Sequence, residues 1–304
     1  MRQITAPRIK IQRHCAWDTE TMTTALPHVS EAESATTTRV GLPKTVLMCR
    51  PDYFRVSYRI NPWMHPENPT DTSKAVDQWT ELYETYQRLG FTVHLIDPVE
   101  GLPDMVYAAN GGLVVDGIAY SAKFRHSERG AEAGHYATWF ADQGFTTADA
   151  AEVNEGEGDF LPVGNRILAA HGFRSDLSSH RELEKVFGKN VVSLKLVRPD
   201  FYHLDTALAV LDDDTISYLP SAFDEPSQQI LEEEFPDAII AEEKDAAWLG
   251  LNLFSDGASV VMAAQATGLA ESIRARGFDV FTVDMSELLL GGGGVKCCTL
   301  ELRR

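Results

Sequence analysis

The chain has 304 residues, of which 44% are hydrophobic, and a formal net charge of −18 at pH 7. A chain of this length can bury a large core in one domain or in two smaller ones. The excess of acidic residues repels nucleic-acid phosphates and anionic lipids, so neither is expected as a partner. It favours solubility and would attract a cationic small-molecule substrate.

The cysteines indicate a reducing compartment. Cys15, Cys49, Cys297 and Cys298 form no Cys-x-x-Cys pair, and adjacent cysteines make poor disulfides. The sequence has no N-terminal apolar segment typical of a signal peptide and no run of about 18 apolar residues typical of a membrane span. We therefore expect a cytoplasmic protein with no membrane partner, and we leave homo-oligomerisation open.

The first 42 residues lack hydrophobic periodicity. Residues 19–38 are rich in Ser, Thr, Ala and Glu, a composition typical of a mobile segment. We predict a flexible N-terminal arm over residues 1–42 and a single α/β domain over residues 43–304.

A unit of two apolar strands joined by a tight turn recurs in the remainder of the chain. Asp-Gly and Gly-Asn between apolar runs are strong hairpin signals. The units begin about 45–48 residues apart, and a period of this size is typical of a repeat architecture. Strands at 45–49 and 91–96 would supply a further unit. The predicted two-strand segments are 113–120, 160–168, 208–216 and 252–261.

Helices are predicted between these hairpins. Residues 73–89 carry apolar side chains at three- and four-residue spacing, and Gly90 ends this segment. Residues 227–234 and 263–276 also have a helical pattern. Strand–strand–helix units repeated around one centre predict a propeller-like α/β fold in which strand ends converge on an axis. An ordinary α+β domain with accidental spacing is the alternative.

The segment 103–112 is the first candidate for a polar site. Asp104 and Asn110 are an even number of residues apart, so on a strand they would face the same side. A capping aspartate and a turn asparagine are the alternative. Arg125 and Arg174 follow consecutive hairpins and are suited to grip a carboxylate, or they are ordinary surface arginines.

Two further polar segments follow. Residues 154–159 place Glu155, Glu157 and Asp159 between glycines, and such carboxylates can bind a guanidinium through two oxygens. His203 and Asp205 are two apart and would share a strand face. A histidine titrating near neutral pH transfers protons, and a neighbouring carboxylate orients it or holds a cation. A solvated acidic turn and an ordinary polar pair are the alternatives.

Four glycines, residues 291–294, precede Cys297 and Cys298. Such a turn lets backbone pack closely against a ligand and can present a nucleophilic thiol at the mouth of a site. A tight turn before a buried strand, with two inert thiols, is the alternative. The chain contains no metal-protease, phosphate-loop or dinucleotide-binding motif, so we expect neither a metal nor a cofactor.

Taken together, these segments resemble the guanidino-group-modifying superfamily, also called the pentein fold, from about residue 44 to the end. This superfamily includes arginine deiminases, dimethylarginine dimethylaminohydrolases and amidinotransferases. The resemblance implies a pentein-type α/β propeller, with five pseudo-symmetric ββαβ-like units around a polar axis.

The resemblance also implies roles for individual residues. Cys297 matches the nucleophile, because it is the first thiol after the glycine-rich turn, and His203 matches the general acid and base. The family's Glu-Gly-Gly-Asp motif falls in residues 155–159, where one extra residue lets Glu155 and Glu157 compete for the catalytic role; we prefer Glu155. The implied substrate contacts are Asp104, Asp205 and one glutamate for the guanidinium, and Arg125 and Arg174 for the carboxylate.

Departures from individual family members narrow the substrate. Asn61 and Asn110 resemble the two asparagines of cyanobacterial arginine dihydrolases, whereas dimethylarginine hydrolases typically carry Glu-Asp in place of Ala109-Asn110. We expect a cysteine-dependent hydrolase that converts arginine to ornithine, ammonia and carbon dioxide, or to citrulline and ammonia. A dimethylarginine dimethylaminohydrolase is the first alternative, an amidinotransferase the second, and a non-catalytic arginine-binding protein the last.

Overall fold

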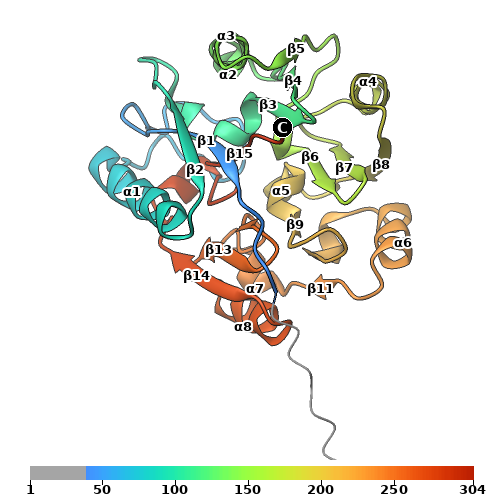
Figure 1. Cartoon of the computed structure of the whole chain (residues 1–304). Coiled ribbons are helices and arrows are strands. Elements are labelled where there is room, and N and C mark those ends of the chain that lie inside the picture. The colour runs from blue at the N-terminus through green and yellow to red at the C-terminus, as the bar shows by residue number, and fades with distance from the viewer. Residues whose placement is uncertain (1–38) are drawn as a thin grey trace, which may run out of the picture. The chain divides into compact units, whose positions relative to one another are not determined.

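The computed structural model describes residues 39–304, which form five three-stranded sheets placed around a common centre (Figure 1). In sheet order, the strands are β15 (Leu300–Glu301), β1 (Thr45–Cys49) and β2 (Thr92–Ile96); β3 (Gly112–Val115), β4 (Ile118–Ser121) and β5 (Thr146–Ala148); β6 (Phe160–Val163), β7 (Arg166–His171) and β8 (Asn190–Lys195); β9 (Leu208–Val210), β10 (Ile216–Tyr218) and β11 (Ile239–Ile240); and β12 (Phe254–Ser255), β13 (Ser259–Ala263) and β14 (Asp279–Val283).

Each sheet combines one antiparallel pair with one parallel pair. The hairpins β3–β4, β6–β7, β9–β10 and β12–β13 are antiparallel, and the third strand of each sheet joins in parallel after a helical crossover. In the remaining sheet, β1 pairs antiparallel with β15 and in parallel with β2, so the two ends of the described chain close the ring. The prediction of five pseudo-symmetric ββαβ-like units is confirmed.

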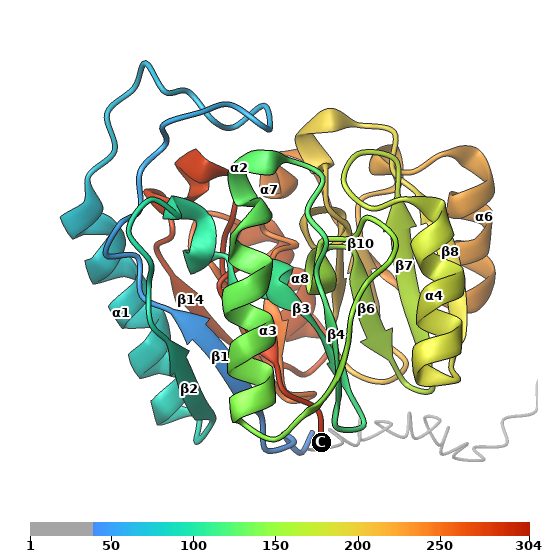
Figure 2. The same cartoon turned by 90° about the horizontal axis from the view of Figure 1, so that it is seen from above.

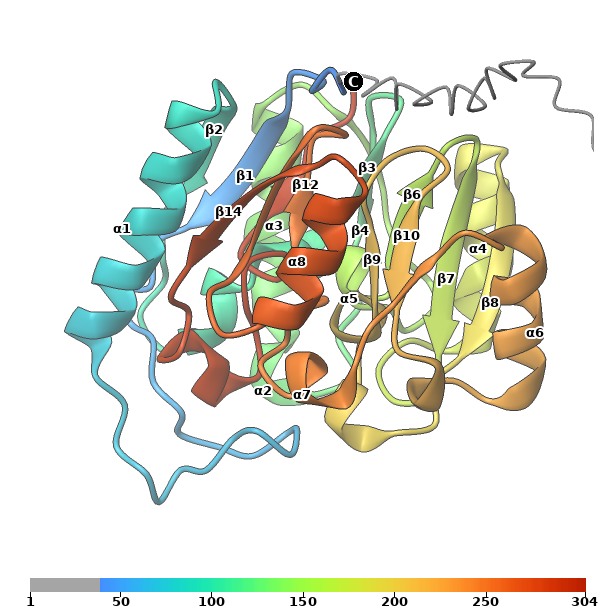
Figure 3. The same cartoon turned by 90° about the horizontal axis from the view of Figure 1, so that it is seen from below.

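The crossover helices lie on the outside of the ring. Figure 2 shows α1, α3 and α4 against the outer sides of their sheets, and Figure 3 shows the same for α6 and α8. The helices are α1 (Thr72–Arg88), α2 (Ser127–Gly130), α3 (Glu132–Asp142), α4 (Leu177–Phe187), α5 (Leu204–Ala207), α6 (Glu225–Glu234), α7 (Glu243–Ala246) and α8 (Thr267–Ala275).

Helix α1 shows how the sequence builds a crossover. The Asp71 side chain accepts a hydrogen bond from the Lys74 backbone N–H and caps the first turn. Gly90, with φ of 79°, follows the last turn and returns the chain towards β2. The buried face includes Trp79, Leu82 and Tyr86. The predicted helix at 73–89 is therefore confirmed to within one residue, and the apolar core lies between such helices and the inner sheets.

The hairpins also follow their sequence signals. Asp116 and Gly117 both have positive φ, 51° and 76°, as a tight two-residue turn requires. Each predicted two-strand segment overlaps a hairpin of the structure, and the second strand of each hairpin runs one to three residues past the predicted end. The expected helix at 263–276 is shorter, because Ala263 still belongs to β13 and the helix begins at Thr267.

Two predictions about shared strand faces are wrong. Asp104 and Asn110 lie in two consecutive 3₁₀ turns, Pro103–Val106 and Ala108–Gly111, that precede β3. His203 immediately precedes the short helix α5, which contains Asp205. At these points the chain turns in from the periphery before a strand begins, so the alternation of a strand does not apply.

The predicted arm over residues 1–42 falls almost entirely outside the described residues, and the domain boundary stays a prediction. Of its last residues, Arg39 forms an ion pair with Asp212 (2.5 Å) and the Leu42 backbone N–H donates to the Asp256 carbonyl (2.8 Å). Within residues 39–304, no helix is long and apolar enough to cross a membrane.

Candidate active site

The glycine-rich turn holds Cys297 close to Tyr107 and Asn252. A side-chain carbon at Gly291 or Gly293 would overlap the Tyr107 side chain, so glycine is required for this close approach. The Asn252 side-chain oxygen accepts from the backbone N–H groups of Gly294 (3.1 Å) and Cys297 (3.0 Å). These contacts fix the backbone that carries the thiol.

The Cys297 thiol is buried and lies 3.3 Å from Asp205 Oδ2, to which it donates. Asn252 Nδ2 donates to the sulfur at 3.1 Å and to the Asp205 backbone carbonyl at 3.0 Å. Burial raises the pKa of the Cys297 thiol well above its usual value, and the adjacent Asp205 raises it further. Burial also raises the pKa of Asp205, to about 7. The unliganded site therefore holds a neutral thiol.

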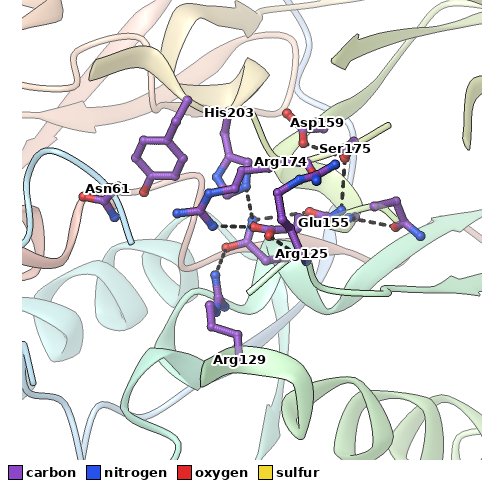
Figure 4. Close-up of polar contacts among 12 residues, drawn as sticks. Asn61, Arg125, Arg129, Glu155, Asp159, Arg174, Ser175 and His203 are labelled. Carbon is purple, nitrogen blue, oxygen red and sulfur yellow. Dashed lines mark hydrogen bonds and ion pairs between the residues drawn. The ribbon is translucent and has the colours of Figure 1, made fainter. Parts of the chain in front are cut away.

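His203 and Glu155 form a buried pair. His203 Nε2 lies 2.8 Å from Glu155 Oε2, and the same oxygen accepts from Arg174 Nη1 at 2.8 Å (Figure 4). Burial alone would raise the pKa of Glu155, but Arg174 and then His203 lower it below its usual value. A carboxylate on Nε2 orients the imidazole and leaves Nδ1 as the atom that can exchange a proton.

The loop that carries Glu155 is held by a second carboxylate. Ser175 Oγ accepts from the Glu155 backbone N–H and donates to Asp159 Oδ2 at 2.6 Å. Asp159 Oδ1 accepts from the Leu204 backbone N–H, next to His203. In Figure 4, Asp159 and Ser175 lie to the right of the Glu155–His203 pair. Their hydrogen bonds hold the backbone of Glu155 and of Leu204, the residue after His203.

Glu157 lies on the other side of the same turn. Its carboxylate accepts from Lys296 Nζ (2.7 Å), from the Glu301 backbone N–H (3.0 Å) and from Arg303. Alternate residues of the 155–159 segment therefore project to opposite sides, and it is Glu155 that contacts His203.

Asp104 is held by a tyrosine and an arginine. Tyr58 donates to Asp104 Oδ2 at 2.8 Å, and Arg129 Nη2 donates to the Asp104 backbone carbonyl at 3.1 Å. Arg129 also donates to Asn110 Oδ1 (2.7 Å) and, through two nitrogens, to Glu132. Burial raises the pKa of Asp104, and Arg129 opposes this shift. The sequence analysis did not name Arg129. The one feature that could have suggested it is its position four residues after Arg125.

The two arginines proposed from the sequence have different environments. Arg174 is buried and, besides Glu155, donates to the Ile60 backbone carbonyl at 2.9 Å. Arg125 is partly exposed, donates to the Arg174 backbone carbonyl (3.0 Å) and pairs with Asp176. The structure therefore brings Arg174 and Arg129, but not the Arg125 guanidinium, into the buried network (Figure 4).

Asn61 closes the site from the loop between β1 and α1. Its side-chain oxygen accepts from the backbone N–H groups of Trp63 (2.9 Å) and Met64 (3.2 Å), and its amide donates to the Gly291 carbonyl at 3.0 Å. These bonds tie the loop to the glycine-rich turn. In Figure 3, this loop lies at the end of the ring opposite the C-terminus.

Three buried polar atoms of the residues described above lack a partner within residues 39–304. They are His203 Nδ1, Asp104 Oδ1 and Asp205 Oδ1. Buried polar atoms are almost always hydrogen-bonded, so such a group marks a place that a ligand can fill. Two carboxylate oxygens suit a cation with several N–H donors, and a cysteine thiol and an oriented imidazole are groups that together can carry out nucleophilic substitution.

A separate cavity of about 650 Å³ lies away from these residues. Its wall includes Lys44, Lys296, Glu301 and Arg303, and not Cys297, His203 or Glu155. In the described part of the chain, no group of three His, Cys, Asp or Glu side chains is arranged to hold a metal ion.

The proteins to which the chain is similar include two enzymes that are named for reactions on guanidino groups. The chain is 52% identical to an N(G),N(G)-dimethylarginine dimethylaminohydrolase of Mycobacterium tuberculosis over 84% of each chain. It is 37% identical to the bifunctional arginine dihydrolase/ornithine cyclodeaminase ArgZ of Synechocystis, over 84% of this chain and 37% of that protein.

The solved N-terminal domain of ArgZ bound to its product, described as an arginine dihydrolase of cyanobacteria, has a TM-score of 0.83 at 36% identity. The match covers 86% of this chain and 98% of that domain. No protein-family model matches the chain. From its fold and from these relatives, the chain belongs to the guanidino-group-modifying superfamily of pentein proteins, in the branch whose named members hydrolyse C–N bonds of linear amidines.

Proposed function

We propose that this protein is a cysteine hydrolase that cleaves a C–N bond in the guanidino group of L-arginine. The observation that carries this proposal is the set of buried polar atoms that have no partner among residues 39–304: His203 Nδ1, Asp104 Oδ1 and Asp205 Oδ1. A guanidinium is a planar cation whose N–H groups match separated carboxylate oxygens. Its central carbon would then lie between the Cys297 sulfur and the imidazole.

The amino-acid end of the substrate needs a cationic partner. We assign the substrate carboxylate to Arg174 and Arg129, because both are buried beside the Glu155–His203 pair, whereas Arg125 is partly exposed and paired with Asp176. Among residues 39–304, Arg174 donates two of its five N–H groups, to Glu155 and to the Ile60 carbonyl, which leaves others for a substrate.

In the proposed reaction, the substrate's own charge activates the nucleophile. The thiol is neutral in the free protein because burial raises its pKa, and a guanidinium beside it favours the thiolate. The thiol proton passes to His203 Nδ1 while sulfur attacks the guanidinium carbon. His203 then gives this proton to the departing nitrogen, so the C–N bond breaks as ammonia leaves and the carbon stays bonded to sulfur.

Water completes the cycle. It gives a proton to His203 while its oxygen attacks the same carbon, the C–S bond breaks, and the proton returns to sulfur. One round consumes arginine and water and yields citrulline and ammonia. A second round on the ureido product would give ornithine, carbon dioxide and a second ammonia, with two waters consumed in total. Asn61 and Asn110, which border the site, are the residues proposed to retain that product.

A second candidate substrate is methylated arginine. The observation in its favour is the 52% identity with the dimethylarginine dimethylaminohydrolase of M. tuberculosis. The same residues would act in the same order, and the leaving group would be a methylamine instead of ammonia.

The test is incubation of the purified protein with arginine and, separately, with asymmetric dimethylarginine, with products identified by mass spectrometry. Ornithine with two ammonia per arginine supports the dihydrolase, and citrulline with one ammonia supports a single round. Citrulline with dimethylamine, formed from the methylated substrate alone, would replace the substrate but keep the mechanism. If neither compound gives any product, the proposed function is overturned. The Cys297→Ser protein, prepared in the same way, controls for contaminating activity.

A further inference from the structure

Asn252 lies in the turn between α7 and β12 and is not used by the proposed mechanism. Its side chain is fully buried. Asn252 Nδ2 donates to the Cys297 sulfur at 3.1 Å and to the Asp205 backbone carbonyl at 3.0 Å. Asn252 Oδ1 accepts from the backbone N–H groups of Gly294 and Cys297. One amide therefore joins the sulfur, the backbone that carries the sulfur, and the helix that carries Asp205.

These contacts fix the orientation of the Asn252 amide. The backbone N–H groups of Gly294 and Cys297 need an acceptor, so the amide oxygen faces them. The amide nitrogen then faces the sulfur and the Asp205 carbonyl. The opposite orientation would set N–H against N–H and oxygen against oxygen. Both amide hydrogens and both oxygen lone pairs are used in this way, so Asn252 serves the sulfur only as a hydrogen-bond donor.

The backbone of the same turn is strained. Leu249 is buried and has φ of 50°, a left-handed conformation that is unfavourable for a residue with a bulky side chain. The Asn252 backbone N–H donates to the Leu249 carbonyl at 2.9 Å and closes the turn. A side-chain carbon at Gly294 would lie 3.0 Å from Asn252 Oδ1, so the glycine allows the two turns to approach closely. Backbone strain of this kind is concentrated at functional sites, and here it accompanies the placement of Asn252.

The sulfur changes its hydrogen bonding during the proposed reaction. In the free protein the thiol donates its proton to Asp205 Oδ2 and accepts from Asn252. When the proton leaves, the sulfur becomes an anion that can only accept, and hydrogen bonds to a charged acceptor are stronger than those to a neutral one. Among residues 39–304, Asn252 is the one side chain that donates to this sulfur. The contact is therefore strongest in the state that attacks the substrate, which is the condition for lowering a reaction barrier.

We propose that Asn252 is a catalytic residue of this site: its side-chain N–H holds the Cys297 sulfur beside Asp205 and stabilises negative charge on that sulfur. This inference rests on the proposed function, because it assigns the attack on the substrate to Cys297. Titratable groups that face the thiol stay unchanged in the variants used as a test; they are Asp205, Cys298, Tyr107 and Tyr202.

The test measures the reactivity of the thiol directly. Alkylation of Cys297 by iodoacetamide, without substrate, is followed by peptide mass spectrometry from pH 6 to 10 in the wild-type, Asn252→Leu and Asn252→Ala proteins. Only the thiolate is alkylated, so loss of the donor should raise the pKa of the Cys297 thiol and lower the rate about tenfold at pH 8. Damage that only loosened the turn would expose the thiol and raise the rate.

Turnover and a matched control complete the experiment. Both Asn252 variants should lower kcat at least about tenfold and change KM less than about threefold, because the lost contact is to the sulfur. Asn154→Ala removes another buried asparagine that accepts from a backbone N–H, that of Gly156, and should leave the alkylation rate within about twofold. If one Asn252 variant does not fold, the other carries the test. Unchanged or faster alkylation in the Asn252 variants would overturn the inference. Slower alkylation in these variants, together with a wild-type protein that turns over neither arginine nor its methylated form, would overturn only the proposed function.

Discussion

Glu155 and Glu157 are two residues apart on one short turn, yet they belong to opposite kinds of environment. On the Glu155 side, three buried polar atoms, one each from His203, Asp104 and Asp205, have no partner among the described residues. Around Glu157, both carboxylate oxygens accept from protein donors, and the network is complete. In our proposal, burial and charge, which the two glutamates share, do not mark the catalytic one; unused hydrogen-bonding capacity on its side of the turn does.

The largest expected effect comes from the nucleophile on the Glu155 side. Cys297→Ser should lower kcat at least about 10³-fold, because a serine hydroxyl is far less acidic than a thiol and cannot take its place. Ammonia release measures the loss. Cys298→Ser is the matched control, since Cys298 is equally buried but contacts neither Asp205 nor His203 through a hydrogen bond; it should keep activity within about threefold. Full activity of Cys297→Ser would contradict the assignment.

Glu155→Gln should have the next largest effect. An amide can still accept from Arg174, but it cannot stabilise a protonated imidazole at His203 as a carboxylate does. We expect kcat to fall about 10²-fold with a smaller change in KM. The direct comparison is Glu157→Gln, for which kcat should change much less. A larger loss of kcat in Glu157→Gln would reverse the roles of the two glutamates.

Asp205→Asn should stabilise the free protein while removing substrate binding. The folded pKa of Asp205, about 7, is above its usual value because of burial, so its stabilising contribution is complete at low pH and is lost as pH rises through about 7. At pH 8 the uncharged amide should raise the free energy of unfolding by roughly 1–3 kcal/mol, and at pH 4 hardly at all. Denaturant unfolding at both pH values measures this. The exposed Asp213→Asn should show no such pH-dependent difference; an equal gain at both pH values would argue against a buried charge.

The smallest effects should separate the arginines. Arg174→Lys removes a planar two-nitrogen donor from a buried site and should raise KM about tenfold. Arg125→Lys alters a partly exposed pair with Asp176 and should change KM less than about twofold. Initial rates over a range of arginine concentrations decide between them. A larger effect at Arg125 would return it to the substrate carboxylate, as the sequence suggested.

The ring of five units could be predicted from the sequence because each hairpin carries a local turn signal and each crossover helix a local period. Cys297 could be proposed as the nucleophile partly for a similar reason, because the run of glycines before it is a local signal of close backbone packing. Its role stays a prediction. Features of the site that depend on contacts between segments far apart in the sequence could not be predicted. Arg129 stands in an ordinary-looking loop, and only its contacts with Asp104 and Asn110 reveal it. The choice between Glu155 and Glu157 depended on which way each side chain points, and a glycine-rich turn has no fixed period.

The pairing of β15 with β1 makes the position of the Cys297 thiol depend on the closure of the ring. Cys297 lies three residues before β15, and Asp205, His203 and Glu155 come from other units of the ring. An opening of the seam between β1 and β15 would separate the sulfur from Asp205, its hydrogen-bond acceptor, and from Asn252, its donor. A molecule that unfolds only at this seam would therefore lose its hydrolytic activity while it keeps most of its structure.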